Sequence, residues 1–270
     1  MLRELSLQEI QQRLYVDMVK ITDWMEEKHI NYSLSGGTLL GAIRHNGFIP
    51  WDDDIDLCAP RPDYERMVRM IRDGKCRIEG LEVTLPGMKG HYSAAIRFQD
   101  ASAVMQRRWL KGERLLPLWV SVFPMDHVSA DPKKFCGDVE RFFLIKHVLH
   151  TASIPPKKPG RHLRWSARRI FYFLLGGYRN VTRLIDLHAR WVGWRNRKGN
   201  RWGNICWTCY QNDWFASDKG FRTQMHAFED GNFSIMKEYD QYLTNVYGDY
   251  MIPLPEGSRK VHNLKVFAVE

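Results

Sequence analysis

The chain has 270 residues, of which 44% are hydrophobic and 13% aromatic, so a disordered chain is excluded and one large or two small domains can form a core. Its formal net charge is +9. This charge is concentrated in residues 155–201, which hold 13 Lys or Arg and one acid, Asp186. The basic segment is therefore a local surface suited to phosphate, anionic lipid or nucleic acid.

The N-terminus lacks the basic-then-apolar pattern of a signal peptide, and the five cysteines are odd in number without regular spacing. We therefore expect a cytoplasmic protein. The longest apolar run, residues 170–175, is far shorter than the ~20 residues of a membrane-spanning helix. We do not expect the chain to cross a membrane.

The first predicted element is a helix over residues 6–28. Ser6 and Glu9 have the spacing of a capping box. Apolar residues then recur every three or four positions, at Ile10, Leu14, Met18, Ile21 and Met25. This spacing predicts a buried stripe without chemistry. The alternation over residues 30–35 predicts a half-buried strand that leads to Gly36.

Residues 36–56 read GGTLLGAIRHNGFIPWDDDID. Gly36 and Gly37 allow a tight turn with exposed backbone N–H groups, and Thr38 can cap a short helix over 39–45. Such a helix N-terminus binds anions, although most glycine pairs in loops are only turns. A P-loop is excluded because no Lys-Ser/Thr follows the last glycine.

Four acids occupy positions 52–56, and Asp52, Asp54 and Asp56 lie two apart. A strand over 54–59 would put Asp54 and Asp56 on one face, where they could ligate Mg²⁺. The match to a calcium-binding EF-hand loop fails, because Leu57 stands at the position where that loop needs glycine. Purely structural capping explains one or two of these acids but not four.

The remaining predicted elements are a helix over 62–72, strands over 76–85 and 94–99, and a helix over about 131–151. After the proline-rich stretch IPPKKPG, two arginine-rich helices with interleaved aromatic residues are predicted over 161–175 and 181–197. Cys206 and Cys209 form the only Cys-x-x-Cys pair, and without further ligands we interpret them as reduced thiols.

Residues 36–57, with 61–64 after them, resemble the LicD family of phosphotransferases, which includes bacterial phosphocholine transferases and fukutin-related ribitol-phosphate transferases. The resemblance implies an α+β fold of the DNA polymerase β-like nucleotidyltransferase type, a mixed sheet with flanking helices. In that pattern a glycine pair opens a helix and an Asp-x-Asp strand follows. Residues 239–262 are similar to the closing segment of the family.

Because the two similar regions lie at both ends of the chain, we expect a catalytic domain of residues 1–152 and 202–270 and a basic helical insertion of residues 153–201. Three interpretations of the insertion stay open. It is a solvated basic face over a core-packed aromatic stripe, a contact for a membrane surface or anionic glycan, or a nucleic-acid surface. The last is disfavoured because no RRM, KH or helix-turn-helix pattern appears.

The chain departs from the family at residues 121–126, SVFPMD, where the family usually has Asp-Ile-Phe-Pro-Leu-Asp. Ser121 replaces the third acid of the family site. Three outcomes are open: Asp126 substitutes if the loop bends back, Asp52 completes the metal site, or the chain is a non-catalytic relative.

The resemblance implies Mg²⁺-dependent transfer, with Mn²⁺ as an alternative, of phosphocholine from CDP-choline to a hydroxyl of a bacterial cell-surface glycan. Lipooligosaccharide or teichoic acid, including lipid-linked forms at the inner face of the plasma membrane, are the expected acceptors. Alternatives are ribitol or glycerol phosphate as the transferred group, a non-catalytic relative, or a basic adaptor whose acids are structural. Catalytic candidates are Asp54, Asp56 and Asp126; metal candidates are Asp52, Asp54 and Asp56; substrate-binding candidates are Gly36, Gly37, Thr38, Arg44, His45, Trp51, Arg259 and His262.

Overall fold

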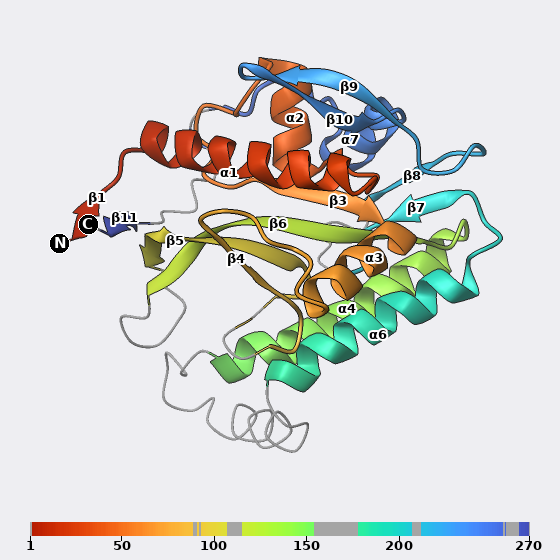
Figure 1. Ribbon diagram of the computed structural model, residues 1–270. Coiled ribbons are helices and arrows are strands. Elements are labelled where there is room, and N and C mark those ends of the chain that lie inside the picture. The colour runs from red at the N-terminus through yellow and green to blue at the C-terminus, as the bar shows by residue number, and fades with distance from the viewer. Residues whose placement is uncertain are drawn as a thin grey trace.

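The computed structural model describes residues 2–88, 91, 93–106, 115–153, 178–206, 212–255, 257 and 265–269. Within these ranges the chain is a mixed α+β protein with helices packed on a large sheet, as predicted (Figure 1). The helices are α1 (Leu7–Glu27), α2 (Gly36–His45), α3 (Arg61–Arg72), α4 (Pro132–Ser153), α6 (Tyr178–Arg195) and α7 (Tyr239–Tyr247). The strands are β1 (Leu2–Glu4), β2 (Ser33–Leu34), β3 (Asp56–Pro60), β4 (Leu81–Thr84), β5 (Ile96–Gln106), β6 (Leu115–His127), β7 (Arg201–Gly203), β8 (Trp214–Ala216), β9 (Thr223–Phe228), β10 (Gly231–Met236) and β11 (Lys265–Val269).

The large sheet has the order β1-β11-β5-β6-β3-β2, with β4 beside β5 and with β7 and β8 extending from the end of β6. Strands β3 and β6 run parallel, and their neighbours pair antiparallel. The hairpin of β9 and β10 forms a separate two-stranded sheet. Because β3 pairs with the second half of β6, the start of β3 lies beside the middle of β6.

Helix α1 confirms the predicted capping box, since the Glu9 backbone N–H donates to Ser6 Oγ and the Ser6 backbone N–H donates to a Glu9 carboxylate oxygen. Its predicted stripe is buried in the main core. Trp24 of α1 packs against Phe98 of β5, with ring centroids 6.4 Å apart. In Figure 1, α1 and α3 lie on the same side of the sheet.

Several predicted boundaries differ from the structure. The strand predicted over 30–35 is reduced to β2, and the strand predicted over 54–59 begins only at Asp56. Strand β5 continues past residue 99 to Gln106. Its pairing with β6 shifts register between Asp100 and Val104, and its second half pairs with β6 on one side and β11 on the other. The helix predicted over 161–175 lies outside the described residues.

A second hydrophobic cluster lies mainly between α4 and α6, which run side by side in Figure 1. Val139 and Phe142 of α4 pack there with Ile185, Ala189 and Val192 of α6. The division into residues 1–152 with 202–270 and an insertion of 153–201 stays a prediction. None of the described helices combines the length and hydrophobicity that a bilayer-spanning segment needs.

Candidate metal and nucleotide site

Helix α2 begins with Gly36 and Gly37, and at each position there is a steric reason for glycine. Gly36 has φ +54°, in the left-handed region that favours glycine. A Cβ on Gly37 would lie 2.7 Å from Asp52 Oδ2, so only glycine lets that carboxylate approach the first helical turn. The backbone N–H groups and the dipole of a helix N-terminus favour negative charge. The turn is therefore suited to carboxylate or phosphate oxygens.

Thr38 ties this turn to the acidic strand. The prediction that Thr38 caps α2 is wrong, because the helix begins at Gly36 with Ser35 as its N-cap. Thr38 Oγ1 instead accepts a hydrogen bond of 2.9 Å from the backbone N–H of Asp56. The Ser35 N–H also donates to the Asp56 carbonyl at 3.0 Å. These bonds fix the start of β3 against the start of α2.

Three acids gather beside this turn. One carboxylate oxygen from each of Asp52, Asp53 and Asp54 lies within 4.8 Å of the others, and Asp53 is buried. Crowded carboxylates repel one another unless a cation lies among them. Carboxylate oxygens are the ligands that Mg²⁺ prefers, so the donor set fits this ion. The sequence pattern missed Asp53, because it assumed a strand from residue 54.

Asp56 belongs to the same site but not to the compact group of three acids. Its Oδ2 lies 4.0 Å from the position that a Cβ on Gly36 would occupy. Tyr247 of α7 approaches the same position, with its hydroxyl oxygen at 3.9 Å. Tyr247 lies in the segment similar to the family's end, but nothing in the sequence spacing places it beside Gly36.

Ser121 pairs with Asp56 across the parallel ladder of β3 and β6, so the replaced acid of the family would stand beside Asp56. On its other side Ser121 pairs with Arg97 of β5. The Arg97 guanidinium carbon lies 3.8 Å from the ring centroid of Trp119. A buried arginine thus flanks the serine, which the sequence alone did not indicate.

Asp126 is not part of this site. Strand β6 continues straight to His127 and pairs with β7 through Asp126, so the chain does not bend back as one expectation required. Because side chains alternate along a strand, Asp126 points to the opposite face of the sheet from Ser121. The structure therefore corrects the expectation that Asp126 substitutes for the third acid.

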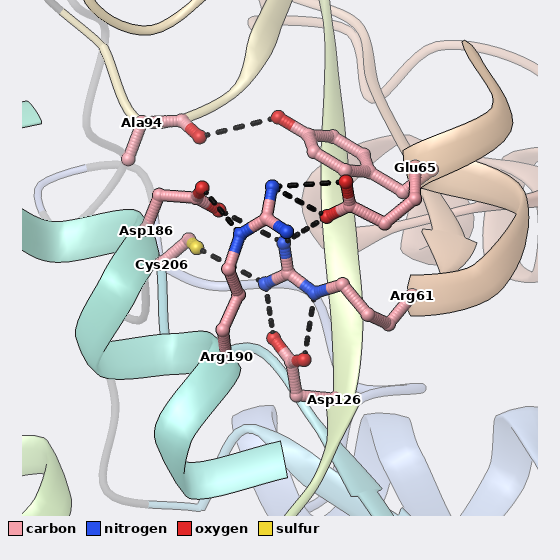
Figure 2. A network of polar contacts seen from close by, with 8 residues as sticks. Arg61, Glu65, Ala94, Asp126, Asp186, Arg190 and Cys206 are labelled. Atoms are coloured by element: carbon pink, nitrogen blue, oxygen red, sulfur yellow. Dashed lines mark hydrogen bonds and ion pairs between the residues drawn. The ribbon is translucent and has the colours of Figure 1, made fainter. Parts of the chain in front are cut away.

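Asp126 instead anchors a buried charge network between α3, β6 and α6 (Figure 2). Arg61 donates to both Asp126 carboxylate oxygens, at 2.8 and 2.5 Å, and to Asp186 at 2.9 Å. Burial would lower the pKa of Arg61, but the charges of Asp126 and Asp186 outweigh it and raise that pKa well above its usual value. The guanidinium stays charged in the interior.

Cys206 lies at the edge of this network, where its sulfur accepts a contact of 3.7 Å from Arg61. Burial raises the pKa of the Cys206 thiol. The thiol is free and buried, as expected for a reduced cysteine. Cys209 lies outside the described residues.

Arg44 and His45 lie in the last turn of α2, about 10 Å along the helix from Gly37. Arg44 donates to the Tyr250 carbonyl at 2.8 Å and to His45 Nε2 at 3.0 Å. Burial and the Arg44 charge both lower the pKa of His45. These contacts hold the C-terminal end of α2 against the residue-250 turn, and the role of both side chains in substrate binding stays a prediction.

The remaining substrate-binding candidates are placed only in part. Trp51, beside the acids in sequence, is half-buried and packs against the main core. Arg259 and His262 lie outside the described residues.

A family model described as LicD/FKTN/FKRP, nucleotidyltransferase domain, matches residues 29–102, which include α2, the acids and β3. The chain is also 27% identical over 246 residues to the Lipopolysaccharide cholinephosphotransferase LicD of Haemophilus influenzae, and this match covers 89% of each protein. The chain is therefore similar to LicD proteins, both in the residues that carry the family model and over most of its length. The resemblance predicted from residues 36–57 is confirmed.

Other LicD relatives match over shorter stretches. The human Ribitol 5-phosphate transferase FKRP is 54% identical over 33 residues, which are 12% of this chain and 7% of that protein. An uncharacterized protein of Rickettsia prowazekii is 46% identical over 58 residues, 22% of each chain. The LicD relatives with named activities transfer a phosphorylated alcohol, so phosphotransfer is the reaction class that they support for this chain.

Proposed function

We propose that this chain transfers phosphocholine from CDP-choline to a hydroxyl of a bacterial cell-surface glycan, lipooligosaccharide or teichoic acid, with Mg²⁺ or Mn²⁺ bound. One observation carries the proposal. Three clustered carboxylates lie against the glycine-opened N-terminus of α2, in a chain similar over 89% of its length to a cholinephosphotransferase. The α2–β3 arrangement beside the parallel strand β6 also supports a DNA polymerase β-like nucleotidyltransferase fold.

In this proposal the residues of the site have separate roles in donor binding, metal binding and proton transfer. The backbone N–H groups of Gly36 and Gly37 bind donor phosphate oxygens. Asp52, Asp53 and Asp54 hold Mg²⁺, which supplies positive charge against the donor diphosphate when bound. Asp56, whose backbone is held by Thr38, accepts the proton of the acceptor hydroxyl. The hydroxyl oxygen then bonds to the β-phosphorus of the donor, and CMP leaves. Asp126 has no part in this chemistry.

The proposal places the reaction in the cytoplasm, where the acceptor glycan is reached on its lipid carrier at the inner face of the membrane. Residues 153–201 then serve as an insertion that contacts the acceptor or the membrane surface. Two alternatives differ in chemistry. The FKRP match favours ribitol or glycerol phosphate as the transferred group, and Ser121 beside Asp56 favours a non-catalytic nucleotide-binding relative.

The test is CMP release from CDP-choline, CDP-ribitol and CDP-glycerol, each with and without Mg²⁺ and a purified acceptor glycan. We expect Mg²⁺-dependent CMP release that is fastest with CDP-choline, together with choline incorporation into the glycan. Asp54→Asn should reduce the rate by at least about 100-fold, whereas the matched surface change Asp73→Asn should not. Nucleotide binding without CMP release would establish the non-catalytic alternative.

A further inference from the structure

One side of helix α6 is buried against the rest of the protein. Val181, Ile185, Ala189 and Val192 are buried, and the last three pack in the cluster shared with α4. Their spacing of three and four residues defines a single core-facing stripe. The need of α6 to bury an apolar side is therefore met within the protein.

The other side of α6 carries a second apolar row that faces outward. Leu184, Leu187, Trp191 and Trp194 are 36%, 59%, 46% and 62% exposed. They follow one another at intervals of three, four and three residues, so they form one continuous stripe. Scattered exposed apolar side chains are common, but a contiguous stripe that includes two tryptophans marks an interaction surface. We call these four residues the outer stripe.

The border of the outer stripe is positively charged. The Arg195 guanidinium carbon lies 4.4 Å from the Trp191 ring centroid, and that of Arg197 lies 4.7 Å from the Trp194 ring centroid. Asp186, the single acid of residues 155–201, is bound by Arg61 and Arg190 (Figure 2). Arg195 is paired with Asp138 of α4, whereas Arg197 donates to the Trp194 carbonyl and keeps its positive charge at the border. Apolar side chains bordered by arginines match the boundary between acyl chains and anionic head groups.

A recess opens beside the outer stripe. It has a volume of about 340 Å³ and lies between α3, α6 and residues 85–86. Leu187 lines it together with Arg72, Arg183, Asp186 and Arg190, and Arg190 is paired with Asp186 and Glu65. Arg72 and Arg183, next to an apolar edge, suit a phosphate head group whose acyl chains continue along the stripe.

We propose that the outer stripe docks α6 flat on an anionic lipid bilayer, with a phospholipid head group in the recess. The helix lies in the interface and does not span the bilayer. Docking concerns lipid binding alone, so it does not depend on which group the enzyme transfers. Residues 154–177 of the same chain, a second copy, or a nucleic acid are the competing occupants.

The first experiment measures partitioning of the full chain onto vesicles of phosphatidylcholine alone or mixed with phosphatidylglycerol. We expect binding to the mixed vesicles that weakens with salt, and little binding to phosphatidylcholine. The triple change Leu187→Gln, Trp191→Gln, Trp194→Gln should weaken binding at least tenfold. The matched control Leu2→Gln, Val16→Gln, Met225→Gln, which alters three other exposed apolar residues, should leave it unchanged.

The second experiment locates the contact. Lipids brominated near the head group should quench tryptophan fluorescence of the parent chain, and Trp191→Phe with Trp194→Phe should remove most of that quenching while preserving partitioning. Equal binding to both vesicle types, or unchanged binding of the glutamine variant with a native melting temperature, would overturn the proposal. The proposal would also be overturned if sedimentation showed a dimer of the parent chain that the glutamine variant does not form, or if the chain bound RNA that anionic vesicles do not displace. Deletion of residues 154–177 with a large gain in vesicle binding would show that this segment covers the stripe, which also overturns it.

Discussion

Ser121 lies directly beside Asp56 in the parallel ladder of β6 and β3, and Arg97 lies on its other side in β5. The position where the family resemblance implies an acid thus holds a small neutral side chain between a carboxylate and a guanidinium. Without a carboxylate at this position the site carries less negative charge, which should weaken its attraction for a metal ion.

We expect Ser121→Asp to lower the Mg²⁺ concentration for half-maximal CMP release by about tenfold, about 1.4 kcal/mol, because it adds a carboxylate beside Asp56. A titration of Mg²⁺ in the CMP-release assay measures this. Ser121→Asn, similar in size but neutral, should change nothing. A higher melting temperature with an unaltered Mg²⁺ requirement would mean that the new carboxylate pairs with Arg97, contrary to this expectation.

Neutralising one clustered acid should stabilise the metal-free protein. Asp54→Asn removes one of three carboxylates whose oxygens lie within 4.8 Å of one another. Relief of about 1 kcal/mol of repulsion would raise the melting temperature by about 2–4 °C without Mg²⁺. The same variant should lose the Mg²⁺-dependent rise in melting temperature that we expect of the parent chain. An equal Mg²⁺ response in both would argue against the cluster as the metal site.

The glycine at position 37 should be required for chemistry and not for the helix. In Gly37→Ala the new methyl group would lie 2.7 Å from Asp52 Oδ2, so the carboxylate must move. We expect CMP release to fall at least about tenfold. Gly137→Ala in α4 meets no atom within 4 Å and should raise stability by roughly 0.5–1 kcal/mol. Similar activities for the two alanine variants would contradict this reading of the turn.

Breaking the Arg61–Asp126 pair should destabilise the fold strongly. Asp126 is 1% exposed, so Arg61→Leu leaves a buried carboxylate without its cation. The change should lower the free energy of unfolding, measured with urea, by about 3–5 kcal/mol. Because burial raises the pKa of Asp126 and the Arg61 charge opposes that shift, the orphaned carboxyl should take up a proton. The double variant with Asp126→Leu should lose less than the sum of the two single changes. Simple additivity would show that the two side chains are not coupled.

Stability should fall as pH rises through the acidic range because of Asp17. Burial, with a smaller contribution from the Asp100 charge, raises the pKa of Asp17 from 3.8 to about 7. Between these values the folded protein holds a proton that the unfolded chain has released, so the free energy of unfolding decreases with pH and levels off above about 7.

Asp17→Asn should remove this slope and exceed the parent chain in stability at neutral pH. Urea unfolding across the pH range measures it, with Asp23→Asn, an exposed acid on the same helix, as the control. Parallel pH profiles for the Asp17 variant and the parent chain would count against the raised pKa.

Local patterns predicted the elements whose signals lie within one segment. The capping box and stripe of α1 are such signals, and so is the glycine-acid stretch that the LicD model matches. Contacts between distant segments could not be read in this way. Arg97 reaches Ser121 only through the pairing of β5 with β6, and Arg61 reaches Asp126 and Asp186 only through tertiary packing.

The error over Asp126 has the same origin. In sequence it stands five positions from Ser121, near enough for a bent loop to bring both to one site. The continuous ladder of β6, which joins β3 on one stretch and β7 on the next, instead keeps the strand extended. Strand alternation then sends the two side chains to opposite faces.

The continuity of β6 also fixes the length of the chain between these two residues. Residues 122–125 separate Ser121, on the Asp56 side, from Asp126, on the Arg61 side. A single inserted or deleted residue would turn one of the two side chains to the wrong face of the sheet. This segment can therefore vary by substitution but not in length, because its length determines which side chain faces the metal site and which faces Arg61.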